Sequence, residues 1–136
     1  MFDLNIITVE KNIFTGRVSS VIVPTVTGEI GILTDHHPLI AKLDIGAIKI
    51  ILEDNSERTI FMAGGFLEVH KNKVAILADL AENLENIALE EASAARKKAE
   101  TMVTEAKDAV TAEKLKEELR IVMMREKLAQ MSKYKK

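Results

Sequence analysis

Glycine and proline are confined to the first half of this 136-residue chain. All six glycines lie at or before Gly65, both prolines lie at or before Pro38, and residues 88–136 contain neither type. Because glycine and proline interrupt helices and form turns, the first half must be divided into short elements, whereas the second half can form long helices. This distribution predicts a turn-rich domain over residues 1–85 and a helical domain over residues 86–136.

Short runs rich in Ile, Val, Phe and Thr alternate with turn residues at intervals of about ten in the first domain, a spacing typical of β-sandwiches. RTIFMA and GFLEVH are predicted as two of these strands. The polar connections EDNSE and HKNK predict hairpin turns, with Asn55 and Asn72 suited to left-handed backbone conformations. We therefore expect an N-terminal antiparallel β-sandwich of about ten strands.

After Ile87, apolar residues recur at steps of three and four, which predicts amphipathic helices. A break at residues 107–111, with Asp108 and Thr111 as candidate N-caps, turns the chain back. The α+β fold class is thus completed by a C-terminal two-helix antiparallel hairpin. Alanine dominates the apolar stripe of the first helix and removes little surface from water, so both a permanently docked hairpin and a detachable arm remain open.

Composition excludes several classes of function. The chain has no cysteine, which excludes disulfides and thiolate metal sites. It has no Trp, one Tyr and a net charge of −2, so we expect no nucleic-acid partner. No apolar run is long enough to cross a membrane and no export signal is visible, so we expect neither feature.

The stretch GEIGILTDHHPLI, residues 28–40, is the strongest candidate for a chemical site. His36, His37 and His70 could in principle bind zinc together with a nearby carboxylate, but adjacent residues of an extended chain point to opposite faces. No G-x-S-x-G motif is present, and the pair Gly64 and Gly65 lacks the Lys-Ser/Thr of a phosphate loop and is more typical of close backbone approach. We predict no metal site, no cofactor and no catalytic residue.

Two ordered motifs, GEIGILTDHHPLI and AGGFLEVHKNKVAILAD, followed by an Ala-rich hairpin, resemble the epsilon subunits of bacterial F-type ATP synthases over essentially the whole chain. The matching positions are Gly28, Glu29, Gly31, Ile32, His36, Pro38 and Leu39 in the first motif and Gly64, Gly65, Phe66 and Val69 in the second. The resemblance implies a non-catalytic subunit of the central stalk of a rotary motor. It also implies a peripheral location at the cytoplasmic face of the bacterial inner membrane, with membrane contact only through the complex.

The resemblance further implies which partners the two domains contact. The sandwich would bind the gamma subunit and the c-ring, with the c-ring side formed by Glu29, Gly31, His36, His37 and Pro38. The hairpin would extend along gamma toward the alpha and beta subunits and inhibit ATP hydrolysis there. Its candidate contacts are the basic and methionine residues of the second helix: Arg120, Met123, Met124, Arg125, Lys127 and Lys133.

The chain departs from the family pattern at two places. Thr34 and Asp35 replace the usual Pro-Gly of the first motif, and we expect Asp35 to preserve the turn. In relatives whose hairpin binds ATP, the first helix opens with Ile-Asp followed by Arg-Ala. The family's nucleotide positions here are Glu82, Ile87, Ala88, Glu91, Ala92, Lys98, Met123 and Lys127. Because a carboxylate replaces an arginine, we predict weak or absent ATP binding. A free-standing nucleotide-binding sensor module is the alternative function.

Overall fold

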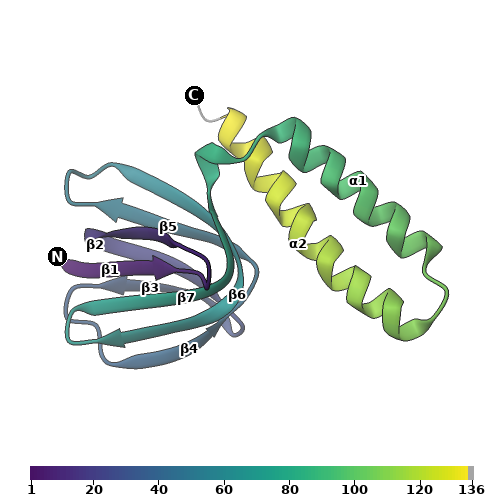
Figure 1. The fold of residues 1–136 in the computed structure, drawn as a ribbon. Coiled ribbons are helices and arrows are strands. Elements are labelled where there is room, and N and C mark those ends of the chain that lie inside the picture. Colours follow the sequence, from purple (N-terminus) through teal and green to yellow (C-terminus); the bar gives the residue numbers. More distant parts are fainter. Residues whose placement is uncertain (135–136) are drawn as a thin grey trace. The chain divides into compact units, whose positions relative to one another are not determined.

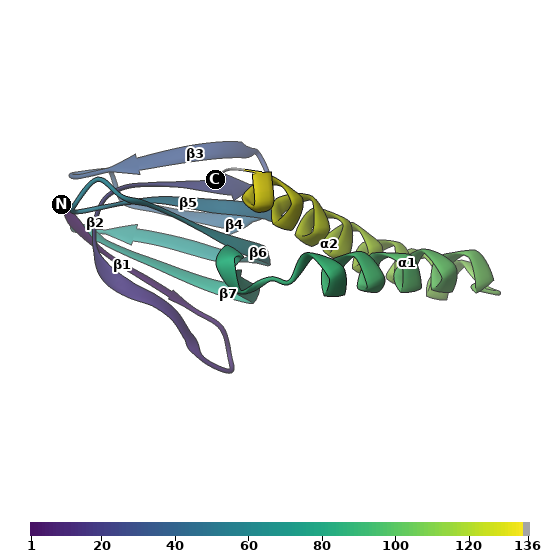
Figure 2. The same ribbon diagram turned by 90° about the horizontal axis from the view of Figure 1, so that it is seen from above.

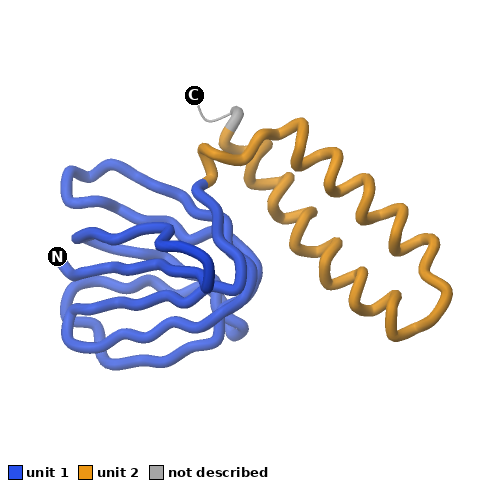
Figure 3. Tube along the Cα trace, viewed as in Figure 1, with its two compact units in different colours: residues 1–83 blue, residues 84–136 orange. Residues whose placement is uncertain are grey.

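The computed structural model describes residues 1–134, with side chains through residue 132. The chain divides into two compact units, residues 1–83 and 84–136 (Figure 3). The first unit is a β-sandwich, and the second is a two-helix hairpin. The α+β fold class predicted from the sequence is therefore confirmed.

The sandwich is built from seven strands of one sheet (Figure 1). Their bounds are β1 Phe2–Ile7, β2 Asn12–Thr25, β3 Gly28–Leu33, β4 Leu39–Leu43, β5 Gly46–Leu52, β6 Glu57–His70 and β7 Lys73–Asn83. The sheet closes on itself, because β1 pairs with both β7 and β2, while β5 pairs with β6 and β2. Every pairing is antiparallel except β1 with β7, which is parallel and corrects the expectation of a purely antiparallel sandwich.

The expected count of about ten strands is wrong, because the described residues form seven. RTIFMA and GFLEVH form one continuous strand, β6, which passes through Gly65 at a positive φ of 128°. A Cβ at Gly65 would overlap the Leu77 carbonyl oxygen and lie 2.8 Å from the Cα of Ala78. Close backbone approach therefore explains this glycine, as predicted, but it does not end the strand. β4 is an additional strand that the sequence pattern does not predict.

The core lies inside the closed sheet and is formed by alternate residues of the strands, as the period of two requires. β1 shows this clearly, since Phe2, Leu4 and Ile6 are buried and the residues between them are exposed. The buried cluster extends from Phe2 to Ala81 and contains no residue of the second unit. The sandwich therefore has a hydrophobic core of its own.

The second unit begins with a 3₁₀ turn, η1 Leu84–Asn86, followed by α1 Leu89–Glu105 and α2 Ala109–Tyr134 (Figure 2). The Asp108 carboxylate accepts a hydrogen bond of 2.7 Å from the Thr111 amide, which confirms Asp108 as the N-cap of α2. Thr111 lies within the first turn of that helix and is not its cap. Neither described helix combines the length and apolar character that a membrane crossing requires.

Candidate functional site

β3 is the open edge of the sheet and carries two of the predicted partner-binding residues. Among the described strands it pairs only with β2. Glu29, Gly31 and Leu33 are exposed along β3, whereas Ile32 between them is buried in the core. A Cβ at Gly31 would meet no atom within 4 Å, so packing inside the chain does not require glycine there. At Gly31 the edge strand therefore has no side chain to keep another backbone from approaching closely.

The turn after β3 holds the remaining residues predicted for the c-ring side. The His36 amide donates a hydrogen bond of 3.2 Å to the Leu33 carbonyl, and Asp35 has a φ of 64°. These features are typical of a type II turn, in which glycine usually occupies the position of Asp35. The expectation that Asp35 preserves the turn is confirmed. His36, His37 and Pro38 therefore follow directly on the exposed edge of β3.

Hydrogen bonds from Asn72 connect this turn to the β6–β7 hairpin, a contact that the sequence did not predict. The Asp35 amide donates to Asn72 Oδ1 at 2.7 Å, and Asn72 Nδ2 donates to Asp35 Oδ1 at 3.0 Å. The N-terminal ammonium of Met1 also donates to Thr34 Oγ1 at 2.7 Å. Asn72 has a φ of 59°, so its conformation, though not its partner, is the predicted one. These bonds hold the turn from two other segments of the chain.

The predicted residues form a strip and not a convergent pocket. Glu29 is near the start of β3, while His36 follows its end, so the two are separated by roughly 3.3 Å for each intervening strand residue. His36 Nδ1 lies 2.7 Å from the His37 carbonyl oxygen, a local contact within the turn. In the part of the chain that the structure describes, no group of three potential ligands is arranged to bind a metal ion. The strip is suited to recognition by a protein surface.

A row of exposed apolar side chains crosses three neighbouring strands and was also missed. We call Ile7 of β1, Leu77 of β7 and Phe66 of β6 the apolar row. Leu77 is the register partner of both Ile7 and Phe66, so the three lie side by side on one face of the sheet. They are 36%, 48% and 56% exposed, respectively. Each of the three occupies a position that alternates with the buried core positions of its strand. An apolar residue at such an outward-facing position was the sign of this row in the sequence.

The second helix distributes its predicted partner-binding residues over two faces. Arg120, Met123 and Lys127 are spaced by three and four residues and are exposed on one helical stripe. Met124 and Arg125 are half-buried. Lys133 lies outside the residues whose side chains are described. The structure therefore brings together only part of the predicted set as an accessible surface.

Arg125 and Arg96 form ion pairs across the hairpin. Arg125 Nη2 donates to Glu91 Oε2 at 2.7 Å, and Arg96 Nε donates to both carboxylate oxygens of Glu126 at 2.8 and 2.9 Å. Hydrogen bonds from Arg96 hold the pKa of Glu126 below its ordinary value of 4.5, although burial acts in the opposite direction. Arg96 also donates to Glu100 at 2.8 Å. The pairs Arg125–Glu91 and Arg96–Glu126 therefore connect α1 to α2.

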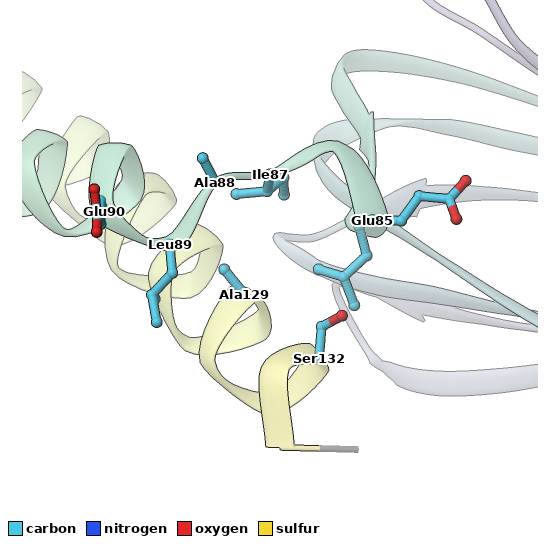
Figure 4. Close-up of a pocket in the computed structure, with 8 residues that line it drawn as sticks. Glu85, Ile87, Ala88, Leu89, Glu90, Ala129 and Ser132 are labelled. Atoms are coloured by element: carbon cyan, nitrogen blue, oxygen red, sulfur yellow. The ribbon is translucent and has the colours of Figure 1, made fainter. Parts of the chain in front are cut away.

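The family's nucleotide positions in the described second unit differ in exposure, and Ala88, Lys98 and Lys127 are exposed. Ile87 and Ala92 are buried, and Glu91 is paired with Arg125. A pocket of about 490 Å³ includes Ile87 and Ala88 and is lined largely by apolar groups and by Glu85 and Glu90 (Figure 4). None of its described lining residues is basic, so the pocket is unsuited to a polyanion. Glu82 belongs to β7 of the first unit.

Comparison with known proteins gives consistent results. Residues 1–84 match the family described as ATP synthase, Delta/Epsilon chain, beta-sandwich domain. The ATP synthase epsilon chain of Bordetella parapertussis is 42% identical over 105 residues, covering 77% of this chain and 75% of that protein. The corresponding chain of Bordetella avium is 40% identical, covering 77% and 74%.

Solved structures show the same fold at lower identity. A chain of the Euglena gracilis mitochondrial ATP synthase OSCP/F1/c-ring structure has a TM-score of 0.79 and 23% identity, covering 91% of this chain and 78% of that chain. A chain of the Tetrahymena thermophila mitochondrial ATP synthase central stalk and c-ring structure has a TM-score of 0.59 and 17% identity, covering 93% and 95%. At these identities the likeness establishes the fold alone.

Proposed function

The chain belongs to the ATP synthase delta/epsilon chain family and corresponds to its epsilon subunit, and from this premise we propose that it couples the gamma subunit to the c-ring of a rotary ATP synthase. The observation that carries the proposal is the presence of two separate exposed surfaces on one rigid sandwich, the apolar row and the β3 edge. A coupling subunit requires two such surfaces. The protein itself is non-catalytic and acts peripherally at the cytoplasmic face of the bacterial inner membrane.

The apolar row is the proposed gamma-binding surface. Ile7, Leu77 and Phe66 together expose a continuous apolar strip, and apolar surface at the centre of an interface contributes most of the binding free energy. The row spans three strands that are held in register by main-chain pairing. Such a surface changes little on binding, which suits a permanent contact within a rotor.

The β3 edge and its following turn are the proposed c-ring surface. Glu29 offers a carboxylate to a basic loop residue, and such a charge pair guides orientation more than it adds affinity. Gly31 leaves room for the partner's backbone. Replacing Gly31 by Arg should leave the fold intact, because the site is open, and should abolish co-purification with the isolated c-ring while binding to gamma is retained. Thr101→Arg on α1 is the matched control, and equal loss for both variants would refute the assignment.

The hairpin is the proposed regulatory arm, which inhibits ATP hydrolysis when it extends along gamma to the alpha and beta subunits. Its exposed stripe of Arg120, Met123 and Lys127 combines positive charge with an adaptable apolar side chain. This combination suits an acidic surface of a catalytic subunit. The contact should weaken with increasing salt, because exposed charges are screened.

ATP hydrolysis by the matching catalytic head tests the whole proposal. The head is reconstituted with the full chain or with a version that ends after Ile87, which keeps the complete core of the sandwich. If both bind gamma and only the full chain slows hydrolysis, the coupling and regulatory roles are supported. If neither slows hydrolysis, the regulatory role is wrong, and if neither binds, the coupling role is wrong as well.

We propose that ATP is not a ligand of the hairpin. The carboxylate at Glu91 repels phosphate and already pairs with Arg125 at 2.7 Å. Isothermal titration of the full chain with ATP should therefore show no saturable heat. A micromolar or tighter site would instead favour the nucleotide-sensor alternative.

A further inference from the structure

The methionines of the chain differ widely in their exposure to solvent. Three exposed methionines lie on the two helices: Met102 at 43%, Met123 at 47% and Met131 at 47%. Met62 of β6 is 0% exposed within the core of the sandwich. Met1 is 42% exposed, and Met124 is half-buried. A dissolved oxidant therefore reaches the outer methionines of the helices but not the methionine of the core.

The thioether groups are the only sulfur atoms of this chain, because it contains no cysteine. When a methionine meets hydrogen peroxide, a lone pair of the sulfur attacks one peroxide oxygen and the O–O bond breaks. The products are methionine sulfoxide and water, so the sulfur is oxidised and the peroxide is reduced. The reaction converts a flexible apolar side chain into a polar one.

Met123 and Met131 belong to the stripe of α2 that is proposed to contact the catalytic subunits. Arg120 lies three residues before Met123, and Lys127 lies four residues after it and four before Met131. All four side chains are exposed. The two methionines supply the apolar part of this stripe, and a sulfoxide there would bring an unpaired polar oxygen into the contact.

Oxidation of Met123 and Met131 should leave the fold of the chain unchanged. Because each residue is 47% exposed, water can hydrate the new sulfoxide oxygen. Met62 differs, since an oxygen added inside the core would be buried without a hydrogen-bond partner. The folded sandwich excludes the oxidant from Met62, so its core stays intact while the helices are modified.

We propose that Met123 and Met131 are sites of reversible oxidation by hydrogen peroxide, and that their sulfoxides weaken the inhibitory contact of the hairpin while gamma binding is retained. A methionine sulfoxide reductase supplied with a dithiol reverses the step, because the sulfoxide oxygen leaves as water and the dithiol becomes a disulfide. The modification is a property of the isolated chain, whereas its effect on inhibition rests on the regulatory role proposed above.

Peptide mass spectrometry of the full chain after treatment with hydrogen peroxide tests the modification. Met123 and Met131 should each gain one oxygen, and Met62 should react at least about tenfold more slowly than either. Unfolding the sandwich in urea before the treatment should remove the protection of Met62, which serves as the internal control. Equal rates for Met62 and Met123 in the folded chain, or no oxygen on Met123, would refute the modification site.

ATP hydrolysis by the matching catalytic head tests the effect of the modification, with the peroxide removed by catalase before reconstitution. The oxidised chain should require about a tenfold higher concentration for half-maximal inhibition than the untreated chain, and reductase treatment should restore the original value. In the double variant Met123→Leu and Met131→Leu, inhibition should be the same before and after peroxide. Met102→Leu, outside the stripe, is the matched control and should respond to peroxide as the unchanged chain does.

The combined results distinguish failure of this proposal from failure of the regulatory role. If both sulfoxides form and inhibition stays the same, the modification site is supported and its effect on the contact is refuted. If peroxide weakens inhibition by the double Leu variant as well, the effect arises at another residue and is refuted for Met123 and Met131. If the untreated chain does not slow hydrolysis, the regulatory role and the effect of oxidation on it are both wrong, and the mass spectra still decide the modification site.

Discussion

Replacing Phe66 by alanine should weaken gamma binding without unfolding the sandwich. Phe66 is 56% exposed and lies outside the buried core cluster, so its removal leaves no internal cavity. In the proposed complex the same side chain, at one end of the apolar row, packs against gamma. The substitution therefore separates the contribution of the apolar row to binding from its contribution to folding.

The expected loss follows from the exposed area of the side chain. A phenylalanine presents about 200 Å² when fully exposed, so 56% exposure leaves about 110 Å² available for burial by a partner. At about 25 cal/mol per Å², this area corresponds to about 2.8 kcal/mol. Alanine retains part of it, so the loss should be about 2 kcal/mol, or about a 30-fold rise in Kd.

Isothermal titration of the purified chain with gamma measures this change directly. Val110→Ala is the matched control, because Val110 is 82% exposed on α2 and lies outside the apolar row. Circular dichroism and urea unfolding should show that both variants retain the fold. A Kd for Phe66→Ala within about twofold of that of the unchanged chain would show that gamma binds elsewhere.

Three further predictions concern stability. Gly65→Ala should lower the free energy of unfolding of the sandwich in urea by more than about 3 kcal/mol, because the new Cβ overlaps the Leu77 carbonyl oxygen and residue 65 has a positive φ. Gly31→Ala is the control, because Gly31 lies in open space, and it should change this free energy by less than about 0.5 kcal/mol. Folding lowers the pKa of Glu126 below 4.5, so the ionised side chain stabilises the hairpin fully above pH 4.5 and loses this effect as the pH falls through the folded pKa. The helix content measured by circular dichroism should therefore decrease as the pH falls below 4.5. Glu126→Gln should reduce this pH dependence. The Thr111 amide likewise lowers the pKa of Asp108, so Asp108→Asn should keep the cap of α2 but remove its sensitivity to acid, and an unchanged acid transition in that variant would contradict the assignment.

The architecture was largely predictable because it depends on local patterns. The change from a period of two to a period of three and four residues places the boundary between strands and helices near Ile87. The Asp108 cap is also local, since the carboxylate contacts an amide three residues later. The strand count was not predictable from local patterns. Gly64 and Gly65 look like a break between two strands, and only the close approach of β7 explains why a glycine is needed inside β6.

One of the two candidate surfaces of the sandwich could be predicted from the sequence and the other could not. The motif around Glu29 and His36 could be located from the sequence, and the structure places both on or beside an exposed edge. The exposed row was missed because alternation identifies two faces of a strand but does not say which apolar residues of neighbouring strands become adjacent. That adjacency depends on the register of β1, β6 and β7, which is set by the whole sheet.

The sequence by itself determined the order of a turn-rich sheet and a helical hairpin, since glycine, proline and hydrophobic period act over a few residues. Only the tertiary structure decided that Asn72 forms hydrogen bonds with Asp35 and that Glu91 forms an ion pair with Arg125. These partners are 37 and 34 residues apart, and many other polar residues of the chain could have met them. Their pairing is selected by the packing of complete strands and helices, because only that packing fixes which distant side chains come within hydrogen-bonding distance.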